Sequence, residues 1–291
     1  MTMMTSYDDK GVVITGAANG IGRELAERLG RAGARLALAD IDEERLRPLA
    51  EDLRGEGVDV VDTVLDVAQP DGLAALAQRL GEEWDRVDYV FSNAGVISVG
   101  CIWQEPVSDW QWLLGTNTMG AVHTMRAFIP LMVDQGPDAE GASSHFVTTA
   151  SIASLLTVEN SPAYVASKFA ALSATEVLEL QLQDAGAPVM AHAVCPAIVR
   201  TDLLDCARHR HPGSFDPADP YYASPDFRRR AQGAAQEMAT VGMPVEQAVT
   251  TILDEVEKGT FYILTHPQYN PAVLGRVQGI VNGARPTKVV R

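Results

Sequence analysis

The sequence predicts an α/β protein with a doubly wound parallel sheet, built as a single domain over residues 1–291. Apolar, β-branched segments alternate with segments of helical periodicity, and a glycine-rich turn joins the first strand to the first helix. Such alternation favours right-handed βαβ units and a sheet with helices on both faces. The expected strands are residues 11–15, 35–39, 58–64, 88–92, 144–149, 189–194 and 260–265, and helices are expected near 20–32, 42–54, 70–84, 106–134, 162–185 and 244–258.

The turn after the first strand has the glycine spacing G-x-x-x-G-x-G, from Gly16 to Gly22. Glycines let the backbone approach a ligand closely, and a helix N-terminus offers free N–H groups and a favourable dipole to a phosphate. Strand, turn and helix follow in the order that a phosphate-binding turn requires. A glycine-rich turn that binds nothing is the alternative that this motif alone leaves open.

Asp40 ends the second expected strand, about twenty residues beyond the glycine turn, where an acid can hydrogen-bond the ribose hydroxyls of an adenosine. A 2′-phosphate there would meet a carboxylate, and two unit charges ~4 Å apart at an effective dielectric of ~20 interact by roughly 4 kcal/mol. Asn19 and Ile41 are neutral, so neither compensates this repulsion. The sequence therefore predicts NAD as the cofactor; a solvated aspartate at a strand end is the alternative.

Tyr164 and Lys168 lie four residues apart in an expected helix, thirteen residues after Ser151. Positions i and i+4 share one helix face, so an ammonium would lie near the phenol. A neighbouring positive charge lowers the pKa of a tyrosine from about 10, toward values useful for proton transfer. Alone, the pair is a weak signal, because a surface lysine near a half-buried tyrosine is common.

Taken together, these motifs resemble the short-chain dehydrogenase/reductase family, and the resemblance extends over roughly residues 8 to 265. Residues 92–95, Ser-Asn-Ala-Gly, are similar to the family's motif at the fourth strand, and residues 196–201 resemble its loop on the nicotinamide side. Two features depart from the pattern. Ala197 stands where many members have glycine, and the common Asp-Gly-Gly ending is absent.

The resemblance implies a Rossmann fold and an NAD-dependent alcohol dehydrogenase or ketoreductase that acts on CH–OH groups. Tyr164 would be the general acid or base, and Lys168 would lower its pKa and hold the nicotinamide ribose. Ser151 would stabilise the reacting oxygen, and Asn117 would help hold a water in a proton relay. The residues implied in cofactor binding are Gly16, Asn19, Gly20, Ile21, Gly22, Asp40, Asp66, Val67, Asn93, Ala94, Gly95, Tyr164, Lys168, Pro196, Ile198, Val199 and Thr201.

The segments that line the family's substrate pocket are mostly apolar here, which indicates a bulky secondary alcohol or ketone of aromatic, alicyclic or steroid-like character. Trp110 and Trp112 are interpreted as helix packing instead. The residues implied to contact the substrate are Ile97, Trp103, Ser151, Ile152, Leu155, Leu156, Tyr164, Ala197, Leu203 and Leu204.

Composition excludes several other classes of function. A formal charge of −15 opposes nucleic-acid binding, which needs clustered Lys and Arg. Cys101, Cys195 and Cys206 have neither metal-ligand nor disulfide spacing, so buried thiols and no metal are expected. No signal peptide and no apolar run of membrane-spanning length is recognisable, and a cytoplasmic location is expected.

Residues 200–232 are expected to be irregular and to form a mobile substrate lid, because prolines interrupt the stretch while scattered apolar side chains can close on a ligand. Those prolines are Pro212, Pro217, Pro220 and Pro225. His209 and His211 lie beside Arg208 and Arg210; a solvated basic loop is favoured over a metal pair, and the arginines could instead meet a carboxylate substrate. Residues 267–291 are expected to form a C-terminal extension.

The expected helices 106–134 and 162–185 carry more apolar residues than one buried stripe requires. Because these helices pair across a two-fold axis in members of the family, we expect a homo-oligomer, a tetramer rather than a dimer. Deeper burial inside one subunit is the alternative.

Three other functions stay open at this point. The first is an NADPH-dependent ketone reductase of the same family. The second is a non-catalytic NAD-binding regulatory protein, which would not need Asn117, Ser151, Tyr164 and Lys168 together. The third is a sugar-nucleotide epimerase or dehydratase, for whose usual C-terminal substrate domain the chain has little room.

Overall fold

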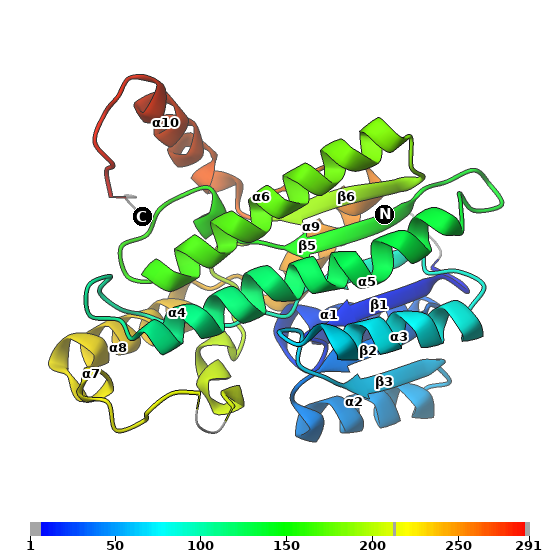
Figure 1. The fold of residues 1–291 in the computed structure, drawn as a ribbon, viewed down its shortest axis with the longest axis horizontal. Coiled ribbons are helices and arrows are strands. Elements are labelled where there is room, and N and C mark those ends of the chain that lie inside the picture. Colours follow the sequence, from blue (N-terminus) through cyan, green and yellow to red (C-terminus); the bar gives the residue numbers. More distant parts are fainter. Residues whose placement is uncertain (1–6, 212–213, 289–291) are drawn as a thin grey trace.

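The computed structural model describes residues 7–211 and 214–288. Within them, a seven-stranded parallel sheet has the order β3-β2-β1-β4-β5-β6-β7 (Figure 1). From β1 to β3 the chain adds strands toward one edge of the sheet, and from β4 onward it adds them toward the other edge. The topological switch point therefore lies between β1 and β4, and ligands bind at such points in sheets of this kind. The strands are β1 (Gly11–Thr15), β2 (Arg35–Asp40), β3 (Val60–Val64), β4 (Tyr89–Ser92), β5 (Ser144–Thr149), β6 (Val189–Val194) and β7 (Tyr262–Ile263).

Helices cover both faces of this sheet, which confirms the predicted doubly wound fold. In β1 the side chains of Val12 and Ile14 enter the core on one face, and that of Val13 enters the core on the other. None of the helices that the structure describes combines the length and the apolarity needed to cross a bilayer. One face is covered by α1 (Gly20–Arg31), α2 (Glu43–Gly55) and α9 (Val245–Glu257), and the other by α3 (Pro70–Glu83), α5 (Gly120–Asp134) and α6 (Pro162–Ala185).

The predicted helix over residues 106–134 is helical throughout most of its length but not regular. It consists of α4 (Val107–Leu113), a π-helical turn η1 (Leu114–Met119) and α5. Single π-helical turns inside α-helices occur frequently at functional sites. Asn117 lies within this turn.

The prediction that residues 200–232 are irregular was wrong in its C-terminal part. The stretch contains η3 (Leu203–His209), a 3₁₀ segment, and the short α7 (Pro220–Ala223), but α8 (Pro225–Val241) begins inside it. Pro225 starts this helix instead of preventing it, because at the first helical position a proline has no intrahelical hydrogen bond to lose and its φ suits the helix.

The C-terminal part of the chain is more helical than the sequence indicated. The last strand, expected over residues 260–265, is only two residues long, and η4 (Pro267–Tyr269) and α10 (Asn270–Val281) follow it. In Figure 1, α10 projects from the body of the molecule. Pro212 in the expected lid and residues 289–291 of the expected extension lie outside the described residues.

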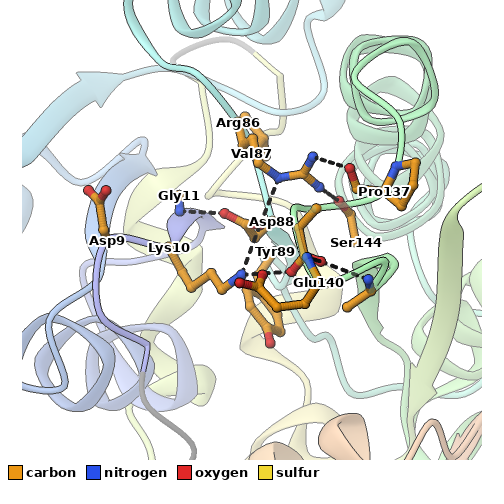
Figure 2. A network of polar contacts seen from close by, with 12 residues as sticks. Asp9, Lys10, Gly11, Arg86, Val87, Asp88, Tyr89, Pro137, Glu140 and Ser144 are labelled. Carbon is orange, nitrogen blue, oxygen red and sulfur yellow. Dashed lines mark hydrogen bonds and ion pairs between the residues drawn. The ribbon is translucent and has the colours of Figure 1, made fainter.

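A polar network closes the sheet at the end opposite the strands' carboxyl termini (Figure 2). Asp88, only 5% exposed, accepts a hydrogen bond from the Gly11 amide at 2.9 Å and one from Arg86 Nε at 3.2 Å. Lys10 Nζ lies 3.6 Å from the same carboxylate, and Arg86 also donates to Ser144 Oγ at 3.2 Å. One buried carboxylate therefore ties the starts of β1 and β4 to the start of β5.

Replacing this carboxylate should destabilise the fold. In Asp88→Ala the Gly11 amide loses its acceptor, and Arg86 and Lys10 each lose one of their contacts, so we expect the free energy of unfolding to fall by about 2–4 kcal/mol. Denaturant unfolding of the purified protein measures this change. Lys10→Met, which removes a half-exposed partner only, should cost less than about 1 kcal/mol; equal losses in the two variants would contradict the central role of Asp88.

Candidate active site

A cleft of about 1340 Å³ follows the carboxyl ends of the strands. It runs from the glycine turn after β1, past the ends of β4 and β5, to the loop after β6. Small-molecule pockets are usually about 300–1,000 Å³, so this cleft has room for a dinucleotide together with a second molecule. All the residues that the resemblance implies in cofactor binding line the cleft, with the exception of Gly22.

The glycine turn has a shape that side chains would destroy. Gly16 and Gly20 have φ values of +65° and +55°, a region that L-residues rarely adopt. A Cβ on Gly20 would lie 2.8 Å from Thr201 Cγ2, and one on Gly22 would lie 2.0 Å from the Gly16 carbonyl oxygen. Gly22 therefore does not line the cleft but allows the turn to fold tightly against the start of α1.

Two acids stand at the side of the cleft beyond this turn. Asp40 accepts hydrogen bonds from the Ala18 amide at 2.8 Å and from the Asp42 amide at 2.9 Å. Burial raises the pKa of Asp40 above its ordinary value, and the two backbone hydrogen bonds oppose this effect. Asp66 accepts from the Ala68 amide at 2.9 Å. Each carboxylate can accept further hydrogen bonds on the side of the cleft. The glycine turn therefore suits the diphosphate of a dinucleotide, and the two acids beyond it suit the adenosine.

The structure brings the four implied catalytic residues together. Lys168 is buried and donates from Nζ to the Thr149 carbonyl at 2.8 Å, and this Nζ lies 5.9 Å from the centroid of the Tyr164 ring. A Cβ on Gly95 would lie 3.2 Å from both Lys168 Nζ and Asn117 Oδ1. Ser151 caps the short turn after β5, with its Oγ accepting from an amide, and it lines the cleft beside Tyr164.

Three hydrogen bonds of its side chain fix Asn117 in place. Its Oδ1 accepts from the Val96 amide at 2.8 Å, and its Nδ2 donates to the Val96 carbonyl and to Ser167 Oγ, both at 2.9 Å. The π-helical turn is therefore pinned to the loop after β4 and to α6, the helix that carries Tyr164 and Lys168.

The pKa values of the central pair differ from the sequence-based expectation. Although part of Tyr164 opens to the cleft, the protein packed around it raises the pKa of its hydroxyl, and a hydrogen bond with Ser151 opposes this. Burial lowers the pKa of Lys168 to about 8. The expectation that Lys168 lowers the pKa of Tyr164 is thus not met in this structure, because removal from water favours the neutral form of both groups.

The substrate residues implied by the resemblance divide into two groups. Seven of them line the cleft: Ile97, Ser151, Ile152, Tyr164, Ala197, Leu203 and Leu204. The structure does not bring Trp103, Leu155 or Leu156 to it. Trp103 is 81% exposed, Leu156 is buried in the protein, and Leu155 packs against an apolar cluster that contains Cys195. These three residues lie away from the cleft because nearness in sequence does not determine the direction of a side chain.

Other cleft residues were missed from the sequence. Trp112, interpreted as helix packing, does pack in an apolar cluster but also lines the cleft. Arg229 and Arg230 reach the cleft from α8, and Lys288 reaches it from the end of the described chain. No local pattern could have found Lys288, because it depends on the path of α10 and the following residues. The three cysteines are buried, free thiols as expected.

The lowered pKa of Lys168 has a measurable consequence for stability. Between about pH 8 and the ordinary value of 10.5, the unfolded chain keeps a proton on Lys168 that the folded chain has released. The cost of burying the ammonium is therefore fully present below about pH 8 and disappears as the pH rises through this window. Lys168→Met has no such cost at any pH.

Denaturant unfolding of the parent and of Lys168→Met between pH 7.5 and pH 9.5 should show this difference. We expect the free energy of unfolding of the parent to rise relative to that of the variant by roughly 2 kcal/mol over this range. Subtracting the variant removes the contribution of cysteines and tyrosines that titrate in the same range. A difference that does not change with pH would contradict the assignment.

Comparison with known proteins agrees with this geometry. The chain matches the model of the short chain dehydrogenase family over residues 10–211. It is 35% identical over 283 residues, 97% of each chain, to a CLA biosynthesis dehydrogenase/reductase of Lactiplantibacillus plantarum. Its structure resembles that of a short chain dehydrogenase/reductase from Burkholderia phymatum in complex with NAD, with a TM-score of 0.92, 33% identity, and coverage of 99% of this chain and 100% of the other.

A short-chain dehydrogenase from Sphingobium yanoikuyae in complex with NADPH is also similar, with a TM-score of 0.71, 26% identity, and coverage of 97% and 98% of the two chains. The family model, the relative that matches along 97% of both chains and the similar solved structures all indicate the same family. The chain therefore belongs to the short-chain dehydrogenase/reductase family, oxidoreductases that use a nicotinamide dinucleotide.

Proposed function

We propose that this protein is an NAD-dependent oxidoreductase that transfers a hydride between a bulky, hydrophobic secondary alcohol or ketone and the nicotinamide. One observation carries the proposal. Ser151, Tyr164 and Lys168 stand at one end of a continuous cleft whose other end holds the glycine turn and Asp40. Groups suited to proton transfer and groups suited to dinucleotide binding therefore share one cavity.

In this proposal Tyr164 is the general acid for ketone reduction and the general base for alcohol oxidation. Its raised pKa keeps the hydroxyl protonated, which suits proton donation to a developing alkoxide. Ser151 Oγ donates a hydrogen bond to the same reacting oxygen. When bound, the dinucleotide accepts or supplies the hydride, and its oxidised ring carries a positive charge.

Lys168 has a pKa of about 8, so it can exchange a proton near neutral pH. It can therefore return a proton to Tyr164 or accept one from it. Asn117 would help to hold the water that links Lys168 to solvent. Both amide hydrogens of Asn117 are already donated to protein groups, so this role rests on the acceptor sites that remain on the residue.

The choice of NAD over NADP rests on Asp40. Its carboxylate lies at the end of β2 and lines the cleft, and it already accepts two backbone hydrogen bonds that favour its charged form. A ribose 2′-hydroxyl can donate to this carboxylate, whereas a 2′-phosphate would be repelled. The bound NAD of the Burkholderia phymatum relative supports the same choice.

The substrate class follows from the walls of the cleft beside Tyr164. They are mostly aliphatic or aromatic there, which favours an apolar alcohol or ketone over a sugar or a small polar acid. The walls at this end include Ile97, Trp112, Ile152, Leu203 and Leu204.

Tyr164→Phe tests the proposed chemistry. Removal of the hydroxyl alone should lower NAD-linked oxidation of secondary alcohols by at least about 10²-fold, because general acid–base catalysis contributes ~10²–10⁴-fold. NADH binding, followed by fluorescence, should stay within a few-fold of the parent. Tyr262→Phe is a matched control, since its hydroxyl contacts Glu176 outside the cleft. Turnover by Tyr164→Phe close to that of the parent would remove Tyr164 from the mechanism.

The ratio of kcat/KM for NAD and NADP tests the role of Asp40. The parent should prefer NAD by about 100-fold or more, and Asp40→Ala should narrow the gap because the repulsion of a 2′-phosphate is lost. Asp62→Ala, which removes an acid paired with Arg47 and Arg54 outside the cleft, should leave the ratio unchanged. Equal use of the two cofactors by the parent would refute the proposal for Asp40.

We also propose that the protein is a homo-oligomer, with α5 and α6 forming one contact between subunits. A shallow, mostly apolar groove lies between these helices, and Val177 and Leu180 of α6 are exposed beside it. Exposed apolar patches of this kind commonly mark interfaces. The apolar residues Leu274, Val277 and Ile280 on α10 are exposed as well and offer a second contact, which favours a tetramer over a dimer.

Light scattering at micromolar concentration tests the assembly. We expect a mass about four times that of the 31.3 kDa chain. Val177→Glu/Leu180→Glu should dissociate the α5–α6 contact, because it places charges in an apolar interface. A monomeric parent would contradict the oligomer, and a stable dimer would contradict the tetramer only.

A further inference from the structure

The segment after β6 crosses the cleft from one end to the other. Near its start, Thr201 packs on the glycine turn, with its Cγ2 2.8 Å from the position that a Cβ on Gly20 would take. Within η3, Cys206 Sγ donates to the Ile97 carbonyl at 3.4 Å, on the side of the cleft that holds Tyr164. The segment therefore contacts both the proposed cofactor side and the proposed substrate side.

The end of this segment makes three polar contacts with acids on the adenosine side. Arg208 Nη2 donates to Asp42 Oδ2 at 2.9 Å, and His209 Nε2 lies 3.4 Å from the same oxygen. His211 Nε2 lies 2.8 Å from Asp66 Oδ2. Asp42 is two residues beyond Asp40, and Asp66 is itself a proposed cofactor residue. All five of these side chains belong to residues that line the cleft.

We propose that Arg208, His209 and His211 form a clasp over the adenosine half of the cleft and slow the release of the dinucleotide. The proposal rests on the NAD-dependent function proposed above. It narrows the wider idea of a lid over residues 200–232 to the part whose contacts are defined. The clasp joins the segment after β6 to acids that follow β2 and β3, and we expect a bound dinucleotide to leave more slowly while these contacts are closed.

The strength of the contacts suits a clasp that opens. Arg208 is 30% exposed and His211 is 61% exposed, whereas Asp42 and Asp66 are largely buried. Half-exposed ion pairs are individually weak. One such ion pair, Arg208–Asp42, together with the two histidine–carboxylate contacts can hold the segment closed and still separate on the time scale of turnover.

Arg210 anchors the segment between the contacting residues. Its side chain is 5% exposed and pairs with Asp109 of α4, which is 1% exposed, at 2.6 Å. The Cζ atom of Arg210 lies 4.1 Å from the centroid of the Trp112 ring and 4.6 Å from that of Phe215. A buried ion pair within aromatic rings is hard to open. Opening of the clasp therefore requires only that Arg208, His209 and His211 leave their acids, while Arg210 stays in place.

A competing arrangement has the opposite effect on release. If His211 occupied the acceptor site on Asp66 that the adenine needs, its removal would strengthen dinucleotide binding. The clasp requires that removal weaken it. The sign of the change in the release rate therefore separates the two arrangements.

The test is stopped-flow measurement of NADH release, followed by the fluorescence of the bound nucleotide. In Arg208→Ala/His211→Ala we expect release to become about tenfold faster and the Kd to rise by a similar factor, the size expected from loss of two partly exposed polar contacts with acids. Arg47→Ala is the matched control. It removes an arginine of α2, the helix that Asp42 caps; Arg47 pairs with Glu43 and Asp62 outside the cleft, and the release rate of this variant should equal that of the parent.

A double-mutant cycle and hydrogen exchange keep the test independent of folding defects. Asp42→Asn retains an acceptor for the helix cap but loses the charge, so its effect on NADH release should not add to that of Arg208→Ala. NADH should slow amide exchange over residues 202–211 in the parent and less so in Arg208→Ala/His211→Ala. Unchanged or slower release in the double variant, or additive effects in the cycle, would overturn the clasp alone. Absence of NADH binding to the parent would overturn the NAD-dependent function and the clasp with it.

Discussion

The site depends on how Asn93 holds the carboxyl ends of three strands. Its Nδ2 donates to the carbonyls of Thr15 and Gly16 at 3.2 Å, and its Oδ1 accepts from Thr149 Oγ1 at 3.1 Å. The carbonyl of Thr149 in turn accepts from Lys168. One amide side chain thus fixes the glycine turn after β1 relative to the lysine on α6. Hydride transfer needs such fixed relative positions, because small displacements of reacting groups cost large factors in rate.

Burial away from water determines which protonation state the residues near Asn93 favour. Tyr164 and Lys168 lie on one helix face, and burial favours the neutral form of each. A hydroxyl that keeps its proton and a lysine that titrates near pH 8 form a pair in which a proton can move with little change in net charge. Asp40 is buried as well, yet its two backbone hydrogen bonds support its carboxylate. In the proposed function, the cleft therefore combines an end for proton transfer with an end that accepts hydrogen bonds from ribose hydroxyls.

The segment after β6 serves both ends because its successive side chains point in different directions. Cys206 contacts the loop after β4, Arg208 reaches Asp42, and Arg210 is buried against Asp109. One short segment thereby connects the apolar wall of the proposed substrate end with the polar contacts of the proposed adenosine end. In such an arrangement, substrate and dinucleotide can affect each other's residence through one short piece of chain.

The sequence by itself determined the parts of this protein that depend on local backbone geometry. The glycine turn over residues 16–22, the acid at the end of β2 and the spacing of Tyr164 and Lys168 could be recognised because their neighbours in sequence are also their neighbours in space. Pro225 shows the limit even of local patterns, since a proline both ends and begins helices. The resemblance to the family supplied the candidate site residues. It could not predict the direction of each side chain, as Trp103 and Leu155 show.

Only the tertiary structure decided which distant residues complete the cleft. Lys288 reaches it after α10, Trp112 lines it with a side chain that also packs in a core, and Arg208 meets an acid 166 residues earlier in the chain. Such contacts carry no period or spacing in the sequence. They arise from the packing of the sheet, α4 and the segment after β6 against one another, a property of the whole chain rather than of any segment.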